Sequence, residues 1–102
     1  MNDLYMYIKA LKKIRCHSPE EKYLVLCSLL DAGFDFTDVM LGKIARGVKA
    51  MDMSWPLVHM VGDNTIDCCY ETGGDDVLDY LPDMITGHSD LQATANEIMN
   101  LF

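Results

Sequence analysis

The sequence predicts an all-α fold, a compact single domain of five to seven short helices. Its 102 residues have the length of one domain, and half of them are hydrophobic. Apolar residues recur every three or four positions over much of the chain, which is the period of an amphipathic helix. Several Ser and Thr residues also stand where helix N-caps are expected. We therefore expect residues 1–102 to form one helical domain.

The first half of the chain carries the clearest helix signals. An apolar stripe predicts a helix over residues 3–15. Ser18, Pro19 and Glu21 mark the start of a second helix, which should end at Gly33. Thr37 should cap a third helix. The expected buried face of that helix consists of Val39, Met40, Leu41, Ile44, Ala45, Val48 and Met51.

Residues 54–72 admit two interpretations. They can form two short helices, or LVHMV and TIDCCY can pair as a hairpin around a Gly-Asp-Asn turn. Short apolar runs cannot be assigned by periodicity alone. We favour helices because both flanks are helical and a lone hairpin is marginally stable. The alternative is an α+β fold with one β-hairpin at about residues 56–70.

The last third of the chain predicts two further helices. Asp75 follows two glycines and can cap a helix over residues 75–85, which Pro82 should kink or divide. The inward-facing residues of that helix should be Val77, Leu78, Leu81, Met84 and Ile85. A final helix should run from Ser89 to Phe102.

The sequence also indicates the cellular compartment of the protein. The longest nearly apolar stretch, residues 23–30, is too short to span a bilayer, and the N-terminus lacks the order of a secretory signal. We therefore expect a cytoplasmic protein without membrane contact. Its four cysteines, two of them adjacent, are expected to be free thiols.

Known motifs for metals, cofactors and catalysis are not matched. An EF-hand loop beginning at Asp63 would have Cys68 at its sixth position and Gly74 at its twelfth, where the motif needs Gly and Glu. No P-loop, dinucleotide fingerprint or nucleophile elbow is present. We predict no catalytic residues, no metal and no cofactor. A fold-assembled zinc or thiol site stays open as a minor alternative, built from Cys16, His17, Cys68 and Cys69.

Charge is divided unevenly along the chain. Residues 1–49 contain all eight basic residues and six acidic ones, whereas residues 50–102 contain ten acidic residues and no Lys or Arg. The formal net charge is −8. This division is the sequence feature that points most directly to a partner.

The acidic residues of the second half are regularly spaced. Steps of three and four would place their carboxylates on shared helix faces, about 5–6 Å apart. The expected partner-binding residues are Asp63, Asp67, Glu71, Asp75, Asp76, Asp79 and Asp83, with Trp55 or Tyr70 as an aromatic anchor. The same acids could instead form an ordinary solvated face, balanced in the fold by basic residues of the first half.

These patterns favour a protein that binds another protein. A row of carboxylates can mimic the phosphates of a nucleic acid and occupy the basic groove of a nucleic-acid-handling target. The hypothesis is an inhibitor or antagonist, like the small anti-restriction and anti-CRISPR proteins of phages and mobile elements, by analogy of size and charge. The expected partner is a protein with a basic surface, without direct nucleic-acid binding. The sequence leaves a homodimer open.

The alternative is a helix-turn-helix regulator that binds nucleic acid through Lys43, Arg46 and Lys49. The net charge counts against it, as do the acidic and apolar residues expected at the start of the third helix. The segment between the second and third helices is also longer than the usual three or four residues.

Overall fold

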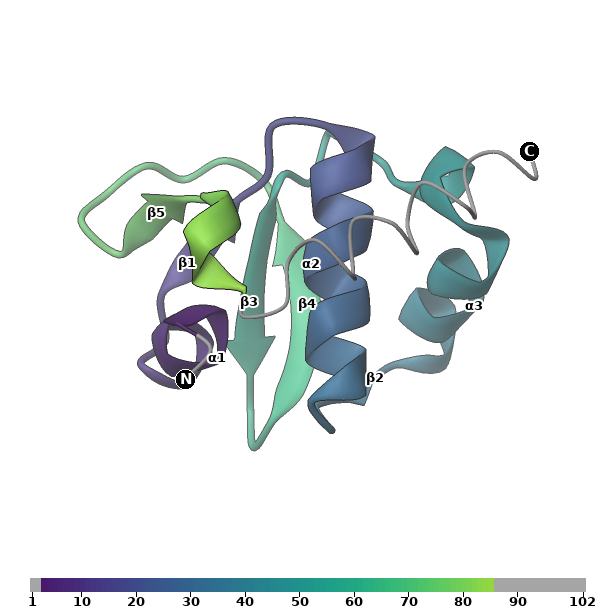
Figure 1. The fold of residues 1–102 in the computed structure, drawn as a ribbon, viewed down its shortest axis with the longest axis horizontal. Helices are drawn as coiled ribbons and strands as arrows, with labels where there is room; N and C mark the ends of the chain where they lie inside the picture. The colour runs from purple at the N-terminus through teal and green to yellow at the C-terminus, as the bar shows by residue number, and fades with distance from the viewer. Residues whose placement is uncertain (1–2, 86–102) are drawn as a thin grey trace.

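The computed structural model describes residues 3–85, and these residues form an α+β fold (Figure 1). They contain three α-helices and a five-stranded mixed sheet, so the all-α prediction is wrong. In chain order the elements are α1 (Asp3–Lys9), β1 (Lys13–Arg15), α2 (Pro19–Asp31), β2 (Asp35–Phe36), α3 (Asp38–Arg46), η1 (Val48–Ala50), β3 (Leu57–Val61), β4 (Thr65–Cys69), β5 (Val77–Asp79) and η2 (Pro82–Met84), where η marks a 3₁₀ turn.

The sheet has the strand order β2-β4-β3-β1-β5. Strands β3 and β4 form an antiparallel hairpin, and β1 pairs antiparallel with β3. The two outer strands are parallel to their neighbours, β5 to β1 and β2 to β4. Both outer strands are very short, which limits the exposed edge that another chain could pair with.

Helices α1 and α2 cover the same face of this sheet. The register places Ile14 opposite Val58, so both side chains lie on one face, and both are fully buried. Leu4 of α1 and Leu26 of α2 belong to the same core. The helices also touch each other, because the Tyr5 hydroxyl donates a hydrogen bond of 3.0 Å to the Ser28 carbonyl.

The N-terminal helix is shorter than the predicted 3–15. It ends at Lys9, and Leu11 takes a left-handed conformation with φ of 64° that no helix continues through. The chain then enters β1, where Ile14 is buried in the sheet. Residues 13–15 pair with β3 on one side and with β5 on the other. This strand pairing outweighs the helical preference of the local sequence.

The caps predicted for the second and third helices are confirmed. The Ser18 hydroxyl accepts from the Glu21 N–H at 3.2 Å, and the Thr37 hydroxyl accepts from the Met40 N–H at the same distance. Helix α3 ends at Arg46, because Gly47 has φ of 86°, rather than running on to residue 51. Three residues of its predicted buried face, Val39, Leu41 and Ala45, are exposed.

Residues 57–69 form the hairpin that the sequence left as the alternative, and the favoured helices are absent there. The three-residue turn 62–64 carries positive φ at Gly62 and Asn64, 60° and 103°. The hairpin is not a lone one, because β1 and β2 pair with its two outer edges. The marginal stability of an isolated hairpin therefore does not apply.

The helix predicted over 75–85 is also wrong. Val77–Asp79 is strand β5, and Pro82 begins a single 3₁₀ turn. Met84 and Ile85 are buried as predicted, whereas Leu81 is exposed. The helix predicted from Ser89 to Phe102 lies outside the described residues. Within residues 3–85 no helix combines the length and apolar character needed to cross a bilayer.

Candidate functional site

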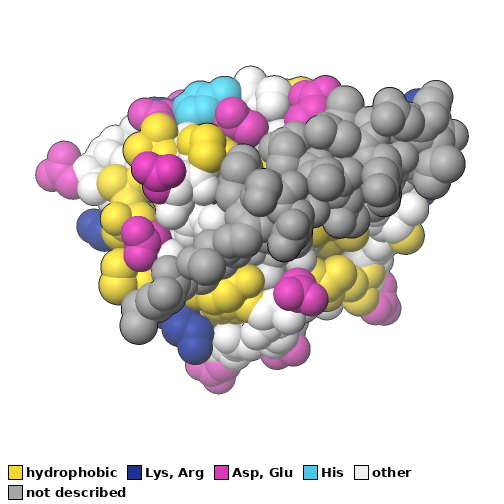
Figure 2. All heavy atoms as spheres, in the orientation of Figure 1, with side chains coloured by type: hydrophobic (Ala, Val, Ile, Leu, Met, Phe, Trp, Pro, Cys, Tyr) yellow, Lys and Arg dark blue, Asp and Glu magenta, His cyan; other side chains and the backbone are white. Residues whose placement is uncertain are grey.

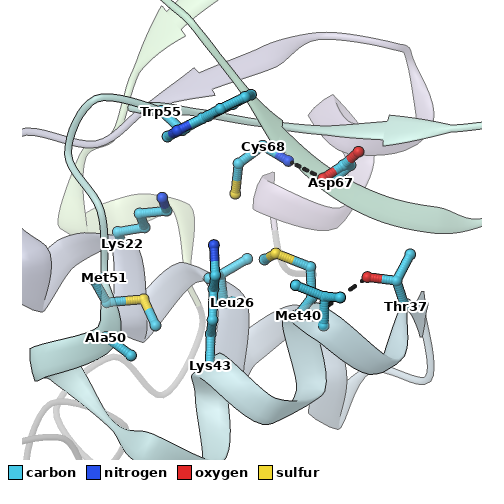
Figure 3. A pocket seen from close by; sticks show the side chains of 11 residues that line it. Lys22, Leu26, Thr37, Met40, Lys43, Ala50, Met51, Trp55, Asp67 and Cys68 are labelled. Carbon is cyan, nitrogen blue, oxygen red and sulfur yellow. Dashed lines mark hydrogen bonds between the residues drawn. The ribbon is translucent and has the colours of Figure 1, made fainter.

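A pocket of about 310 Å³ lies between α3 and the edge of β4 (Figure 3). Strand β2 pairs with β4 only at Thr65 and Ile66, so among the described residues no strand covers this edge from Asp67 onward. The pocket occupies that uncovered position. Its lining residues are Lys22, Leu26, Thr37, Val39, Met40, Lys43, Ala50, Met51, Trp55, Asp67 and Cys68.

Local sequence explains how the helices present these side chains. Lys22 and Leu26 stand four residues apart on α2 and therefore share one face. The Thr37 cap fixes the start of α3, and Met40 and Lys43 follow at a spacing of three on the pocket side. Gly47 then turns the chain into η1, which brings Met51 to the opposite wall.

One backbone N–H group on the uncovered edge of β4 is satisfied by a side chain of the same strand. The Cys68 N–H donates a hydrogen bond of 2.8 Å to the Asp67 carboxylate. Burial raises the pKa of the Cys68 thiol to about 11. The thiol is therefore protonated at neutral pH and is a poor nucleophile. Among residues 3–85, moreover, no three His, Cys, Asp or Glu side chains form a potential metal site.

Two lysines give the pocket its positive charge. Lys22 is only 4% exposed, and its Nζ donates a hydrogen bond of 2.8 Å to the Asp52 carbonyl. Neither Lys22 nor Lys43 forms an ion pair with a carboxylate of the described residues. Figure 3 shows both amino groups directed into the space below Trp55. A buried ammonium without an anionic partner is unfavourable, so this arrangement favours an anion in the pocket.

Trp55, which lines the pocket, stacks on the ring of Tyr70. The ring centroids of Trp55 and Tyr70 are 4.1 Å apart, with an angle of 25° between the planes. Tyr70 is 59% exposed and Trp55 is 36% exposed. Both predicted anchors therefore lie together on the surface, although they come from different segments of the chain.

The predicted acidic residues do not share a helix face. Asp63 lies in the hairpin turn and Asp67 in β4. Glu71, Asp75 and Asp76 lie between β4 and β5, Asp79 in β5 and Asp83 in η2. On the face shown in Figure 2, acidic side chains are scattered among hydrophobic ones rather than gathered in one row. Helical spacing was the wrong basis for this prediction because the segment is mostly strand and loop.

Part of this acidic set is neutralised within the fold. Arg15 bonds both oxygens of Glu71 and donates to Asp79 at 2.8 Å. The Lys13 amino group lies 3.7 Å from the Asp76 carboxylate. Register explains the Arg15–Asp79 pair, because β1 lies beside β5 with Arg15 opposite Asp79. Basic residues of the first half thus balance acids of the second, as the alternative interpretation expected.

His17 extends this charge network to α2. Its Nδ1 lies 2.8 Å from Glu21 and its Nε2 lies 3.0 Å from Asp79. The hydrogen bond to Asp79, with that to Glu21, raises the pKa of His17 above its usual value. The hydrogen bonds from His17 and from Arg15 lower the pKa of Asp79. Sequence reasoning missed this cluster because its members lie far apart along the chain.

The residues of the nucleic-acid alternative, Lys43, Arg46 and Lys49, lie on α3 and η1. Strand β2 separates α2 from α3, where a helix-turn-helix has only a short turn. Lys43 points into the pocket, and the Arg46 side chain bonds the Gly42 carbonyl of its own helix at 3.2 Å. Lys49 lies in η1.

Comparison with known proteins finds no matching family model, no similar curated protein and no similar solved structure. The site therefore stands on geometry alone. Sequence reasoning had named Trp55, Tyr70, Asp67 and Lys43 but not Lys22. The available signal was a lysine followed at once by Tyr-Leu-Val-Leu within the predicted second helix.

Proposed function

We propose that this protein acts by binding another protein through a surface centred on the Trp55–Tyr70 stack. The exposed stack is the observation that carries the proposal. Large aromatic side chains are common anchors of protein interfaces, and exposing them to water without a partner is unfavourable. The stack also holds both rings in fixed positions before contact, which lowers the entropy lost on binding.

Charge supports a partner that presents Arg and Lys. Asp67 lines the same pocket as Trp55, and its carboxylate forms no ion pair with the described residues. Guanidinium and ammonium groups stack on aromatic faces and pair with carboxylates, so the surface offers both kinds of contact. The net charge of −8 adds long-range attraction toward a basic partner.

The finer proposal is an antagonist of a basic, nucleic-acid-handling target, of the kind that phages and mobile elements encode. In this proposal the protein inhibits by occupancy and is not an enzyme. Because Glu71, Asp76 and Asp79 are paired internally, nucleic-acid mimicry would depend mainly on Asp63, Asp67, Asp75 and Asp83. No described contact favours the helix-turn-helix alternative, so we propose no second function.

A pull-down from source-cell lysate at low and high salt tests this proposal. The bait proteins are the wild type, Tyr70→Ala and the control Leu81→Ala, which removes an apolar side chain of similar exposure. We expect a basic partner on wild type and control, with recovery at least about tenfold lower on Tyr70→Ala and lower in high salt. Equal recovery on all three baits would contradict the proposal.

A further inference from the structure

We propose that the pocket below Trp55 binds a small organic acid, with its carboxylate between Lys22 and Lys43 and its apolar body against the pocket walls. This proposal does not depend on the protein partner. The pocket volume of about 310 Å³ lies at the lower end of the usual range for ligand sites, roughly 300–1,000 Å³. The ligand must therefore be a small molecule.

The charge of the ligand follows from the two lysines. An ammonium has three donors, and the Nζ of Lys22 uses one of them on the Asp52 carbonyl. The remaining donors of Lys22 and those of Lys43 meet no carboxylate within ion-pair distance among residues 3–85. Burial raises the pKa of the Cys68 thiol, and the charges of both lysines oppose that rise. Both amino groups therefore lie near the pocket wall that Cys68 forms. A carboxylate between them would supply the missing counter-ion.

The nearby carboxylates do not take that place. Asp67 lies on the far side of Cys68 from Lys22 in Figure 3, and it accepts the Cys68 N–H. Asp52 is held by the Ser54 N–H at 2.9 Å, which is the main reason that its pKa is lowered, and the two lysines lower it further at longer range. The ligand carboxylate should therefore sit at the lysine end of the pocket, away from Asp67.

The body of the ligand follows from the remaining walls. Leu26, Met40 and Met51 supply apolar surface, and the Trp55 ring covers the mouth. Methionine sulfur and an indole face both favour an aromatic ring. An aryl or medium-chain aliphatic acid therefore fits both ends of the pocket.

Trp55 is the only tryptophan in the chain, so its fluorescence reports on this pocket. We would titrate the full chain with phenylacetate and octanoate, and with their neutral amides, phenylacetamide and octanamide. We expect at least one acid to give a saturable change, and its amide to bind at least about tenfold more weakly. Acid binding should also raise the melting temperature.

Lys43→Met should weaken acid binding at least about tenfold, and Lys43→Arg should retain most of it. The control is Arg46→Met, which removes a charge from the same helix outside the pocket and should leave binding unchanged. Unaltered melting in the absence of ligand would show that each variant folds. Equal binding of acid and amide, unchanged binding by Lys43→Met, or no saturable change with either acid would overturn the proposal.

Discussion

Lys22 holds a positive charge inside the protein, on a helix whose neighbouring residues Tyr23, Leu24 and Val25 are all buried. Desolvating an ammonium is costly, and one hydrogen bond to a carbonyl offsets only part of that cost. We predict that Lys22→Met raises the free energy of unfolding by about 1 kcal/mol. Urea denaturation would measure it, with the exposed Arg46→Met as control. A loss of stability in Lys22→Met would show that the ammonium is better compensated than these contacts indicate.

His17 couples stability to pH through Glu21 of α2 and Asp79 of β5, and Asp79 is also bonded by Arg15 of β1. Because folding raises the pKa of His17, its stabilising effect is complete below the usual value of 6.5 and is lost as pH rises through the folded-state pKa. All of these side chains are partly exposed, so the effect should stay below about 1 kcal/mol.

The stability difference between wild type and His17→Gln should therefore be larger at about pH 6 than at about pH 9. Urea denaturation at the two pH values measures it. A difference that does not change with pH would mean that the imidazolium is not stabilised by its two carboxylates.

At the scale of elements, β4 alternates between buried and partly exposed side chains, whereas β3 runs from a buried start to an exposed end. Ile66 of β4 is fully buried, whereas Val61 of β3 is 36% exposed. We predict that Ile66→Ala lowers the free energy of unfolding by about 2–5 kcal/mol, and Val61→Ala by less than about 1 kcal/mol. Urea denaturation of the two variants measures both. Similar losses at the two positions would contradict the strand register.

The elements differ in how far the sequence predicts them. The Ser18 and Thr37 caps act within three residues, so local sequence was sufficient to find the starts of α2 and α3. Strands β1 and β5 have only three residues each, and Lys13 pairs with Val77 from the other end of the described chain. A three-residue strand is too short to show the alternation of apolar and polar residues that identifies a strand. The helical spacing of the neighbouring residues therefore led to the prediction of helices in both places.

The candidate site was less predictable than the fold. Its lining comes from α2, α3, η1, the segment before β3 and β4. Trp55 and Tyr70 could be named as anchors from residue type alone, but their stacking depends on the hairpin. Lys22 could not be connected with Lys43 without the packing of α2 against α3.

At the scale of the whole molecule, ion pairs within the fold neutralise part of the uneven charge distribution. Arg15 joins β1 to Glu71 and Asp79 of the acidic half. We predict that Arg15→Gln lowers the urea midpoint, because those two carboxylates would lose their shared counter-charge. The loss should be larger at low salt than at high salt. Arg46→Gln, which removes an arginine outside this network, should change the midpoint little at either salt concentration. An equal loss at both salt concentrations would mean that packing rather than charge is responsible.

Our central claim about the pocket is that its two lysines bind the carboxylate of a small organic acid below Trp55. The most direct test is the two-dimensional ¹H–¹⁵N spectrum of the labelled protein during titration with phenylacetate and, separately, phenylacetamide. We expect little change with the amide and saturable shifts with the acid, concentrated at Lys22, Met40, Lys43, Met51 and Cys68. Shifts spread over other surfaces, or identical shifts with acid and amide, would contradict it.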